Sequence, residues 1–350
     1  MLDRLIARLT IKKQELDSDV DFEDLPEEIA AESRQTVANL ASPQPYHEVV
    51  TKNVKEAVFN WQENTEKKNS LIFLNSPIEN FPKLLDETIS NSEILANFLV
   101  SYLIPERPND LDGVEKELAN LTENSLTKKI IVIPSLSQCF LRCIGGLEGI
   151  IELREKMLEN KQIFWLIGCN YWAWEYLDYL CQIRAYFEQE ISLPVLSWEE
   201  IHDWLEPAAK QINADVNQEI PELQRLYLEK LAGIYLGIPA VAACLWLRSL
   251  HYDPESKMVI RRKHSLPELP SLNSSDRYLL YSLLLHGNMN LSALTTSLGE
   301  SKSIVRADVQ KLKKLNLVQG DTSQLQINPL HYPKLRLELS QNNFLIAGEN

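Results

Sequence analysis

Three short apolar runs, each followed by a helical pattern, constrain the fold of this chain more than any other feature. They are Leu71–Leu74 in "SLIFLN", Ile130–Ile133 in "KKIIVIPSL" and Ile163–Ile167 in "QIFWLIGCN". Strands that are apolar along their whole length are typical of a parallel sheet covered by helices on both faces. A shorter run around Ile191–Leu193 predicts a fourth strand, so residues 46–207 are expected to form one α/β domain.

The stretch "SLIFLNSPIENFPKLLDE", residues 70–87, has the layout of a strand, a phosphate-binding loop and a helix. A loop of the form GxxxxGK[ST] binds phosphates through backbone N–H groups and a lysine, and binds magnesium through a hydroxyl. The same spacing here places Pro77 and Pro82 at the glycines, Lys83 at the lysine and Leu84 at the hydroxyl. Proline cannot adopt positive φ and has no N–H to donate. Only the lysine of the pattern is therefore retained.

The second apolar strand does not end in the acidic pair that such a site uses to hold magnesium and to activate water. Pro134 and Ser135 stand where the two carboxylates are expected. Neither side chain is a base or a magnesium ligand. Together with the altered loop, these replacements predict that magnesium-dependent hydrolysis is lost.

The pattern becomes helical after Pro194. Ser197 and Glu200 in "SWEEIHDWL" predict a capping box, and further helices are expected over Pro221–Ile238 and Ala240–Leu250. Residues 208–264 are therefore predicted to form a helical lid, followed by a proline- and serine-rich linker over residues 265–274.

Residues 275–340 predict a separate C-terminal unit. Helices are expected over Asp276–Leu285, Leu291–Leu298 and Ile304–Leu315, with Ser301 capping the third, and "LVQGDTSQLQINPL" reads as a hairpin. This is the order of a winged-helix domain. Five bases lie on or beside the third helix: Lys302, Arg306, Lys311, Lys313 and Lys314. They indicate a solvated face, a DNA-binding helix or a protein-docking surface.

From about Val49 to Leu250 the chain resembles the AAA+/STAND class of P-loop ATPases, closest to origin-recognition-like ATPase domains. The resemblance rests on the order of strands, on "IRAYFEQEISLPVLSWEEIHDWL", and on the lid stretch "LGIPAVAACLWL", which is similar to the family's GxP helix. A winged helix after the lid is also frequent in that class. The resemblance implies a P-loop-NTPase-like sheet with a nucleotide-binding role for Lys83, Asn170 as the family's sensor 1 and Arg184 as its arginine finger. The alternative is that each residue has only a structural role. Lys83 would then be an exposed lysine at a helix start, Asn170 a turn residue at a strand end, and Arg184 an arginine in a salt bridge.

The N-terminal residues 1–45 predict an amphipathic helix and an acidic linker. Leu2–Lys13 alternates apolar residues with bases, which is typical of a loosely packed arm or of a helix that docks on a partner or a membrane surface. From Glu15 to Glu32 there are nine carboxylates and no base, which predicts a solvated linker.

The net charge of −14 disfavours nucleic-acid binding unless positive charge is concentrated locally. The five scattered cysteines predict reduced core thiols, and no metal site is expected. The cysteine pattern also suggests a cytoplasmic location. No apolar run reaches about 18 residues, so no membrane span is expected, and the first residues do not read as a secretory signal. An aromatic cluster over Trp165–Tyr179 indicates either core packing or a partner-binding patch.

Three functions are consistent with these patterns. The leading hypothesis is a catalytically inactive ATPase-like scaffold or adaptor that needs no cofactor and acts through protein contacts, with DNA as a further partner. The second is an ATPase or nucleotide switch that binds ATP through Lys83, Asn170 and Arg184. The third is a winged-helix DNA-binding regulator.

Overall fold

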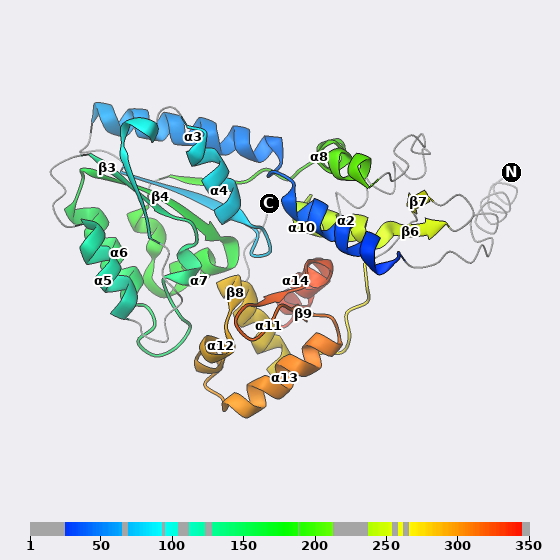
Figure 1. Ribbon diagram of the computed structural model, residues 1–350. Helices are drawn as coiled ribbons and strands as arrows, with labels where there is room; N and C mark the ends of the chain where they lie inside the picture. Colours follow the sequence, from blue (N-terminus) through cyan, green and yellow to red (C-terminus); the bar gives the residue numbers. More distant parts are fainter. Residues whose placement is uncertain are drawn as a thin grey trace, which may run out of the picture.

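The computed structural model describes residues 25–64, 69–92, 95–103, 112–122, 128–187, 189–212, 237–253, 258–261 and 266–344. The predicted helix Leu2–Lys13 and most of the predicted helix Pro221–Ile238 lie outside these ranges. Within them the chain forms an α/β domain, a group of helices beside it and a C-terminal unit that packs against it (Figure 1).

A five-stranded parallel sheet forms the centre of the α/β domain. Its strands are β1 (Ser70–Asn75), β2 (Leu99–Tyr102), β3 (Lys129–Ile133), β4 (Ile163–Asn170) and β5 (Glu190–Ser192). They pair in the order β2-β3-β4-β1-β5, so β4 lies between β1 and β3. Every residue of β1 and β4 is buried, because helices cover both faces of the sheet. The predicted α/β class is confirmed.

Two layers of helices enclose this sheet (Figure 1). α3 (Gln44–Glu63) and α4 (Phe81–Ser90) cover one face, and α5 (Asp112–Thr122), α6 (Glu148–Glu159) and α7 (Tyr171–Cys181) cover the other. Side chains alternate along β1, so Leu71 and Phe73 pack under α3 and α4 while Ile72 and Leu74 face the opposite layer. Short 3₁₀ turns connect the elements: η1 (Leu95–Asn97), η2 (Leu136–Gln138) and η3 (Ile183–Tyr186).

A second group of helices packs beside the α/β domain. It contains α2 (Glu27–Asn39), α8 (Trp198–Gln211), α10 (Pro239–Ser249) and a hairpin of β6 (Leu250–Asp253) and β7 (Met258–Arg261). The predicted capping box of α8 is present, because Ser197 Oγ accepts from the Glu200 amide at 3.2 Å and Glu200 Oε2 accepts from the Ser197 amide at 2.7 Å. The prediction of a solvated linker up to Glu32 is wrong for its last residues. α2 begins at Glu27 and buries its apolar side against α8 and α10.

The C-terminal unit contains the three predicted helices and the predicted hairpin. Its elements are α11 (Ser274–His286), β8 (Asn288–Met289), α12 (Leu291–Leu298), α13 (Lys302–Lys314), β9 (Val318–Gln319), β10 (Leu325–Ile327), η4 (Pro329–His331) and α14 (Tyr332–Gln341). The strands form an antiparallel sheet of order β8-β10-β9. Gly299 ends α12 at φ 67°, a left-handed conformation that glycine adopts readily. Ser301 precedes α13 as predicted, but its hydroxyl contacts Ser303 Oγ at 3.1 Å instead of capping the helix.

The C-terminal unit and the α7 side of the sheet share one hydrophobic core. α11 contacts α7 and η2, and Figure 1 shows α11 below the sheet. Trp172 of α7 contacts Tyr281 of α11 with ring centroids 5.8 Å apart, and its Nε1 donates to Tyr332 Oη at 3.0 Å. In the part of the chain that the structure describes, no helix is both long and apolar enough to span a membrane.

Candidate functional site

The loop after β1 is held by hydrogen bonds within the chain. The Glu79 amide donates to the Ser76 carbonyl at 3.1 Å, and Asn80 Oδ1 accepts from the Lys83 amide at 3.3 Å as the N-cap of α4. Glu79 Oε1 accepts from the Ala240 amide at 3.1 Å, at the start of α10. The loop is therefore a compact turn that is attached to the neighbouring helices.

Both glycine positions of the phosphate-loop pattern are proline, and an aromatic ring lies between them. Pro77 is buried and Pro82 lies in the first turn of α4. Phe81, the first residue of α4, is 2% exposed. A Cβ atom on Gly168 of β4 would lie 2.4 Å from Phe81 Cδ1, and the ring centroids of Phe81 and Phe73 are 5.8 Å apart. The Phe81 ring therefore fills the space between the start of α4 and the sheet.

Lys83 contacts the end of α2. Its Nζ donates to the Leu40 carbonyl at 2.6 Å and to the Ala38 carbonyl at 3.1 Å. The last carbonyls of a helix have no partner inside the helix and attract a cation. In this structure Lys83 therefore anchors α2 to the α/β domain.

Asn170, at the end of β4, connects the α/β domain to the C-terminal unit. The residue is 5% exposed. Its Oδ1 accepts from the Ala173 amide at 2.8 Å, which caps α7, and its Nδ2 donates to the Leu285 carbonyl of α11 at 3.1 Å. Asn75 is its register partner on β1 and donates from Nδ2 to the Cys169 carbonyl at 3.1 Å. Asn170 and Asn75 thus both donate to the protein's own carbonyls at this end of the sheet.

The residues after β3 also contact the C-terminal unit. Ser135, at one of the two positions where carboxylates were expected, has its hydroxyl 2.9 Å from Ser137 Oγ. Ser137 Oγ donates to the His286 carbonyl at 3.2 Å, and the Ser137 carbonyl accepts from His286 Nδ1 at 3.2 Å. The end of α11 therefore sits at the carboxyl edge of β3 and β4.

Arg142 makes a further contact across this interface, and the sequence patterns did not single it out. Its guanidinium Nη2 donates to Ser282 Oγ and to the Ser297 carbonyl, both at 3.2 Å. Its backbone amide donates to His286 Nε2 at 3.3 Å. One arginine of the α/β domain thus bonds to both α11 and α12.

Arg184 is surrounded by carboxylates of its own domain. It forms ion pairs with Glu175, with Asp178 at 3.0 Å and with Glu190 at 3.4 Å. The hydrogen bond to Glu175 is the main cause that raises the pKa of Arg184 above its ordinary value. The geometry agrees with the salt-bridge reading of this residue.

The structure does not bring Lys83, Asn170 and Arg184 together around one pocket. Their partners are the end of α2, the end of α11 and the acidic side of α7, respectively.

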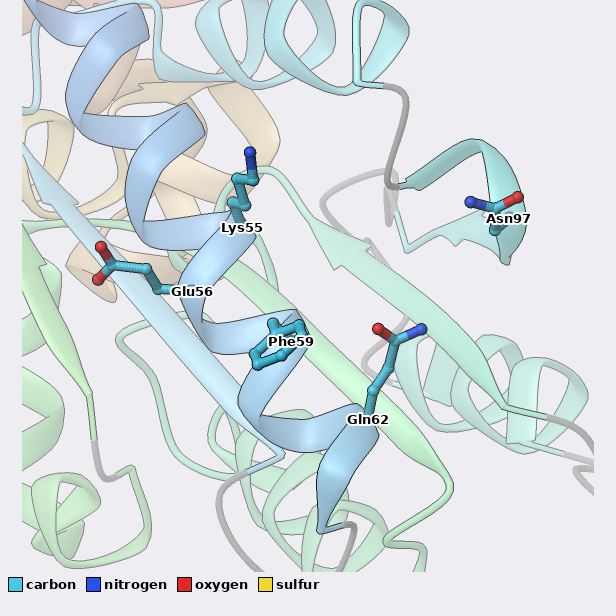
Figure 2. Close-up of a pocket in the computed structure, with 5 residues that line it drawn as sticks. All are labelled: Lys55, Glu56, Phe59, Gln62 and Asn97. Carbon is cyan, nitrogen blue, oxygen red and sulfur yellow. The ribbon is translucent and has the colours of Figure 1, made fainter.

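A hollow of about 490 Å³ lies elsewhere, along the outer side of α3 (Figure 2). It is lined by Lys55, Glu56, Phe59, Gln62 and Asn97.

The five cysteines all lie in the described ranges and form no disulfide; Cys143, Cys181 and Cys244 are only partly buried, so the predicted core position holds for the other two. Cys139 and Cys169 are buried, and burial raises the pKa of Cys169 well above its ordinary value. Within the described ranges, no three His, Cys, Asp or Glu side chains are grouped so that they could hold a metal ion.

The basic residues of α13 have different environments. Lys311 Nζ contacts both carboxylate oxygens of Asp276 at 2.8 and 2.6 Å, and Asp276 is 0% exposed. Lys313 Nζ donates to the Gly320 carbonyl in the hairpin. The side chains of Lys302, Arg306 and Lys314 are exposed. At least two of the five bases therefore stabilise the unit itself.

The aromatic cluster is mainly part of the core. Trp165, Trp172 and Trp174 are each at most 1% exposed, whereas Tyr179 is 76% exposed. Trp174 Nε1 donates to Glu190 Oε2 at 3.0 Å. The core interpretation holds for the tryptophans.

The parallel sheet of order β2-β3-β4-β1-β5 with helices on both faces is a P-loop-NTPase-like α/β fold. No protein-family model matches the chain, and no curated protein matches it. Among solved structures, the chain is similar to Cdc6p from Pyrobaculum aerophilum, with 14% identity and a TM-score of 0.40 over 89% of this chain and 98% of that one. It is also similar to the ORC1 protein of Aeropyrum pernix in complex with DNA, with 14% identity and a TM-score of 0.44 over 87% and 98%. A point variant of RuvB from Thermotoga maritima shows 15% identity and a TM-score of 0.36 over 83% and 94%.

Proposed function

We propose that this chain is a catalytically inactive, ATPase-like scaffold or adaptor that acts through protein contacts. The observation that carries this proposal is the bond from Asn170 Nδ2 to the Leu285 carbonyl, 3.1 Å long and buried. In the ATPase class that the sequence resembles, the polar residue at this position serves the nucleotide. Here its donor is used by the chain's own α11.

The surrounding residues support the same proposal. The phosphate-loop lysine, Lys83, is bonded to carbonyls at the end of α2. The arginine-finger position, Arg184, is paired with three carboxylates of its own domain. Pro134 and Ser135 supply no carboxylate for magnesium. Each of these four positions is therefore either replaced or bonded to another part of the chain.

A thermal-shift measurement with ATP and magnesium tests the proposal. A ligand at 100 times its Kd stabilises a protein by about 2.7 kcal/mol, so a nucleotide switch predicts a clear rise in Tm. We expect no rise and no phosphate release. A rise accompanied by phosphate release would contradict the scaffold function.

Lys83→Ala provides the control for this measurement. If Lys83 only anchors α2, the substitution lowers Tm by the same amount with and without nucleotide. If Lys83 binds phosphate, the substitution abolishes a nucleotide-dependent rise that the wild-type chain shows.

DNA binding by the C-terminal unit is a second candidate, favoured by the exposed bases Lys302, Arg306 and Lys314 on a chain of net charge −14. The unit's first three helices, α11, α12 and α13, and its small antiparallel sheet support the winged-helix interpretation, in which α13 would enter the major groove. The test is the salt dependence of binding to duplex DNA. Lys302→Glu with Arg306→Glu is expected to abolish binding, whereas Lys52→Glu with Lys55→Glu on α3 is the matched control. Equal binding by both variants would reject this candidate.

Charge reversal at Lys311 is a poor test of DNA binding. Its Nζ lies 2.6 Å from the buried carboxylate of Asp276, so the substitution would destabilise the unit whether or not it binds DNA.

A cytoplasmic location and a protein partner belong to the scaffold proposal. Pull-down from a cell extract, with and without residues 1–24, tests whether the N-terminal segment contributes to the contact.

A further inference from the structure

His286 lies at the interface between the C-terminal unit and the α/β domain, and both of its ring nitrogens are bonded across it. It is the last residue of α11 and is 1% exposed. Nδ1 lies 3.2 Å from the Ser137 carbonyl oxygen, and Nε2 accepts from the Arg142 amide at 3.3 Å. The ring also packs on Phe140, with centroids 4.8 Å apart. The imidazole therefore fills a site made by the segment that follows β3.

The partners of this imidazole fix its protonation state. The Arg142 backbone N–H can only donate, so Nε2 must carry a lone pair. The Ser137 carbonyl can only accept, so Nδ1 must carry the proton. A neutral ring with its proton on Nδ1 satisfies both contacts. An imidazolium would direct a second N–H at the Arg142 N–H, and one of the interface bonds would be lost.

The charges around the ring oppose protonation as well. Arg142 bonds the ring through its backbone amide, and its guanidinium donates to Ser282 Oγ one turn earlier on α11. Cys143 follows Arg142 in the chain and lies near Glu148, Tyr176 of α7 stacks on Phe140, and Tyr281 belongs to α11 like His286 itself. Burial raises the pKa of Cys143 and of Tyr176, and raises that of Tyr281 to about 12, so these groups stay neutral in weak acid. The Arg142 guanidinium is positive, and a second positive charge beside it is unfavourable.

We propose that His286 is a proton-sensitive lock, which holds the C-terminal unit on the α/β domain at neutral pH and loosens it in weak acid. This inference does not depend on the scaffold function, because it uses only the geometry of the interface. The docked state excludes the imidazolium, whereas a solvated histidine binds a proton with a pKa of about 6.5. Docking is therefore fully stabilised above about pH 6.5 and weakens as the pH falls below it. Between about pH 7.5 and about pH 5.5 the equilibrium constant for opening rises about tenfold.

Amide hydrogen exchange of the full-length chain, followed by NMR, tests the lock. The Arg142 amide is the reporter because its N–H is bonded to the ring. After correction for the intrinsic exchange rate, we expect its protection to fall about tenfold from about pH 7.5 to about pH 5.5. His286→Gln, which does not titrate, is expected to show a change of less than about twofold, and His202→Gln on α8 is expected to behave like the wild type. Constant protection in the wild type, or the same fall in His286→Gln, would overturn the proposal.

A second measurement needs no substitution. Imidazole ¹⁵N shifts of the wild-type chain report both the tautomer and the titration of each histidine. We expect His286 to carry its proton on Nδ1 and to remain neutral while the C-terminal unit is docked. A proton on Nε2, or titration of His286 near pH 6.5 without any loss of Arg142 protection, would also reject the lock.

Discussion

Replacing Asn170 with serine separates its two hydrogen bonds. Serine is about as good an N-cap as asparagine, so the bond to the Ala173 amide at the start of α7 is retained in kind. The serine hydroxyl is too short to reach Leu285, so the carbonyl at the end of α11 loses its donor. A buried carbonyl without a donor costs about 1–3 kcal/mol. We expect Asn170→Ser to lower the free energy of unfolding by that amount without nucleotide present.

The assay is urea unfolding of the full chain without nucleotide, with Asn290→Ser as the matched control. Asn290 caps α12 by accepting from the Ala293 amide at 2.7 Å, so this substitution exchanges one cap for another. We expect the control to change stability by less than about 0.5 kcal/mol. Asn170→Ala should cost about 1 kcal/mol more than Asn170→Ser, because it also removes the cap of α7.

Equal stabilities for Asn170→Ser and Asn290→Ser would refute the reasoning. That result would mean that the bond to Leu285 contributes nothing and that Asn170 is available for another partner. The comparison therefore also bears on the scaffold proposal, which rests on that bond.

Three further substitutions test other parts of the structure. Gly168→Ala places a Cβ atom 2.4 Å from a Phe81 ring carbon and is expected to lower the free energy of unfolding by about 1–3 kcal/mol or more, as measured by urea unfolding. Lys311→Met leaves the buried carboxylate of Asp276 without its cation and should lower the free energy of unfolding by about 1–3 kcal/mol. The loss is smaller than for a fully buried ion pair because the Lys311 side chain is 44% exposed. The double variant with Asp276→Asn should recover part of this stability. Burial raises the pKa of Cys244 from 9.0 to about 11. Its neutral thiol therefore stabilises the fold below pH 9, and this contribution is lost as the pH rises through 11. Cys244→Ala should flatten the dependence of the free energy of unfolding on pH in this range.

The sequence predicts the α/β domain well because its strands have a strong and simple signal. A strand buried on both faces must be apolar throughout, and β1, β3 and β4 are the three runs of this kind. α2 was missed because its buried side includes Ser33 and Thr36, so the carboxylates around it dominate the pattern. The replacement of the phosphate-loop glycines was also readable, since proline has a fixed φ and no N–H.

The docking of the C-terminal unit was not predicted, although part of its signal is present. The stretch "LLYSLLLH", residues 279–286 of α11, is mostly apolar around the whole helix, and every one of these residues is buried. The pattern shows that α11 is enclosed but not by what. Arg142 had no signal, because a single arginine in a loop does not indicate which helix it will contact. The partners of Asn170 and Lys83 likewise depend on contacts between distant segments.

The shared interior of the two units has a consequence for how the chain comes apart. Trp172 precedes residues 266–272 in the chain, and Tyr281 and Tyr332 follow them. All three nevertheless belong to the same apolar cluster. Cleavage in that segment would not release two autonomous fragments, because each would present a surface that water disfavours. The described part of the molecule should melt cooperatively, as a single thermodynamic body despite its modular appearance.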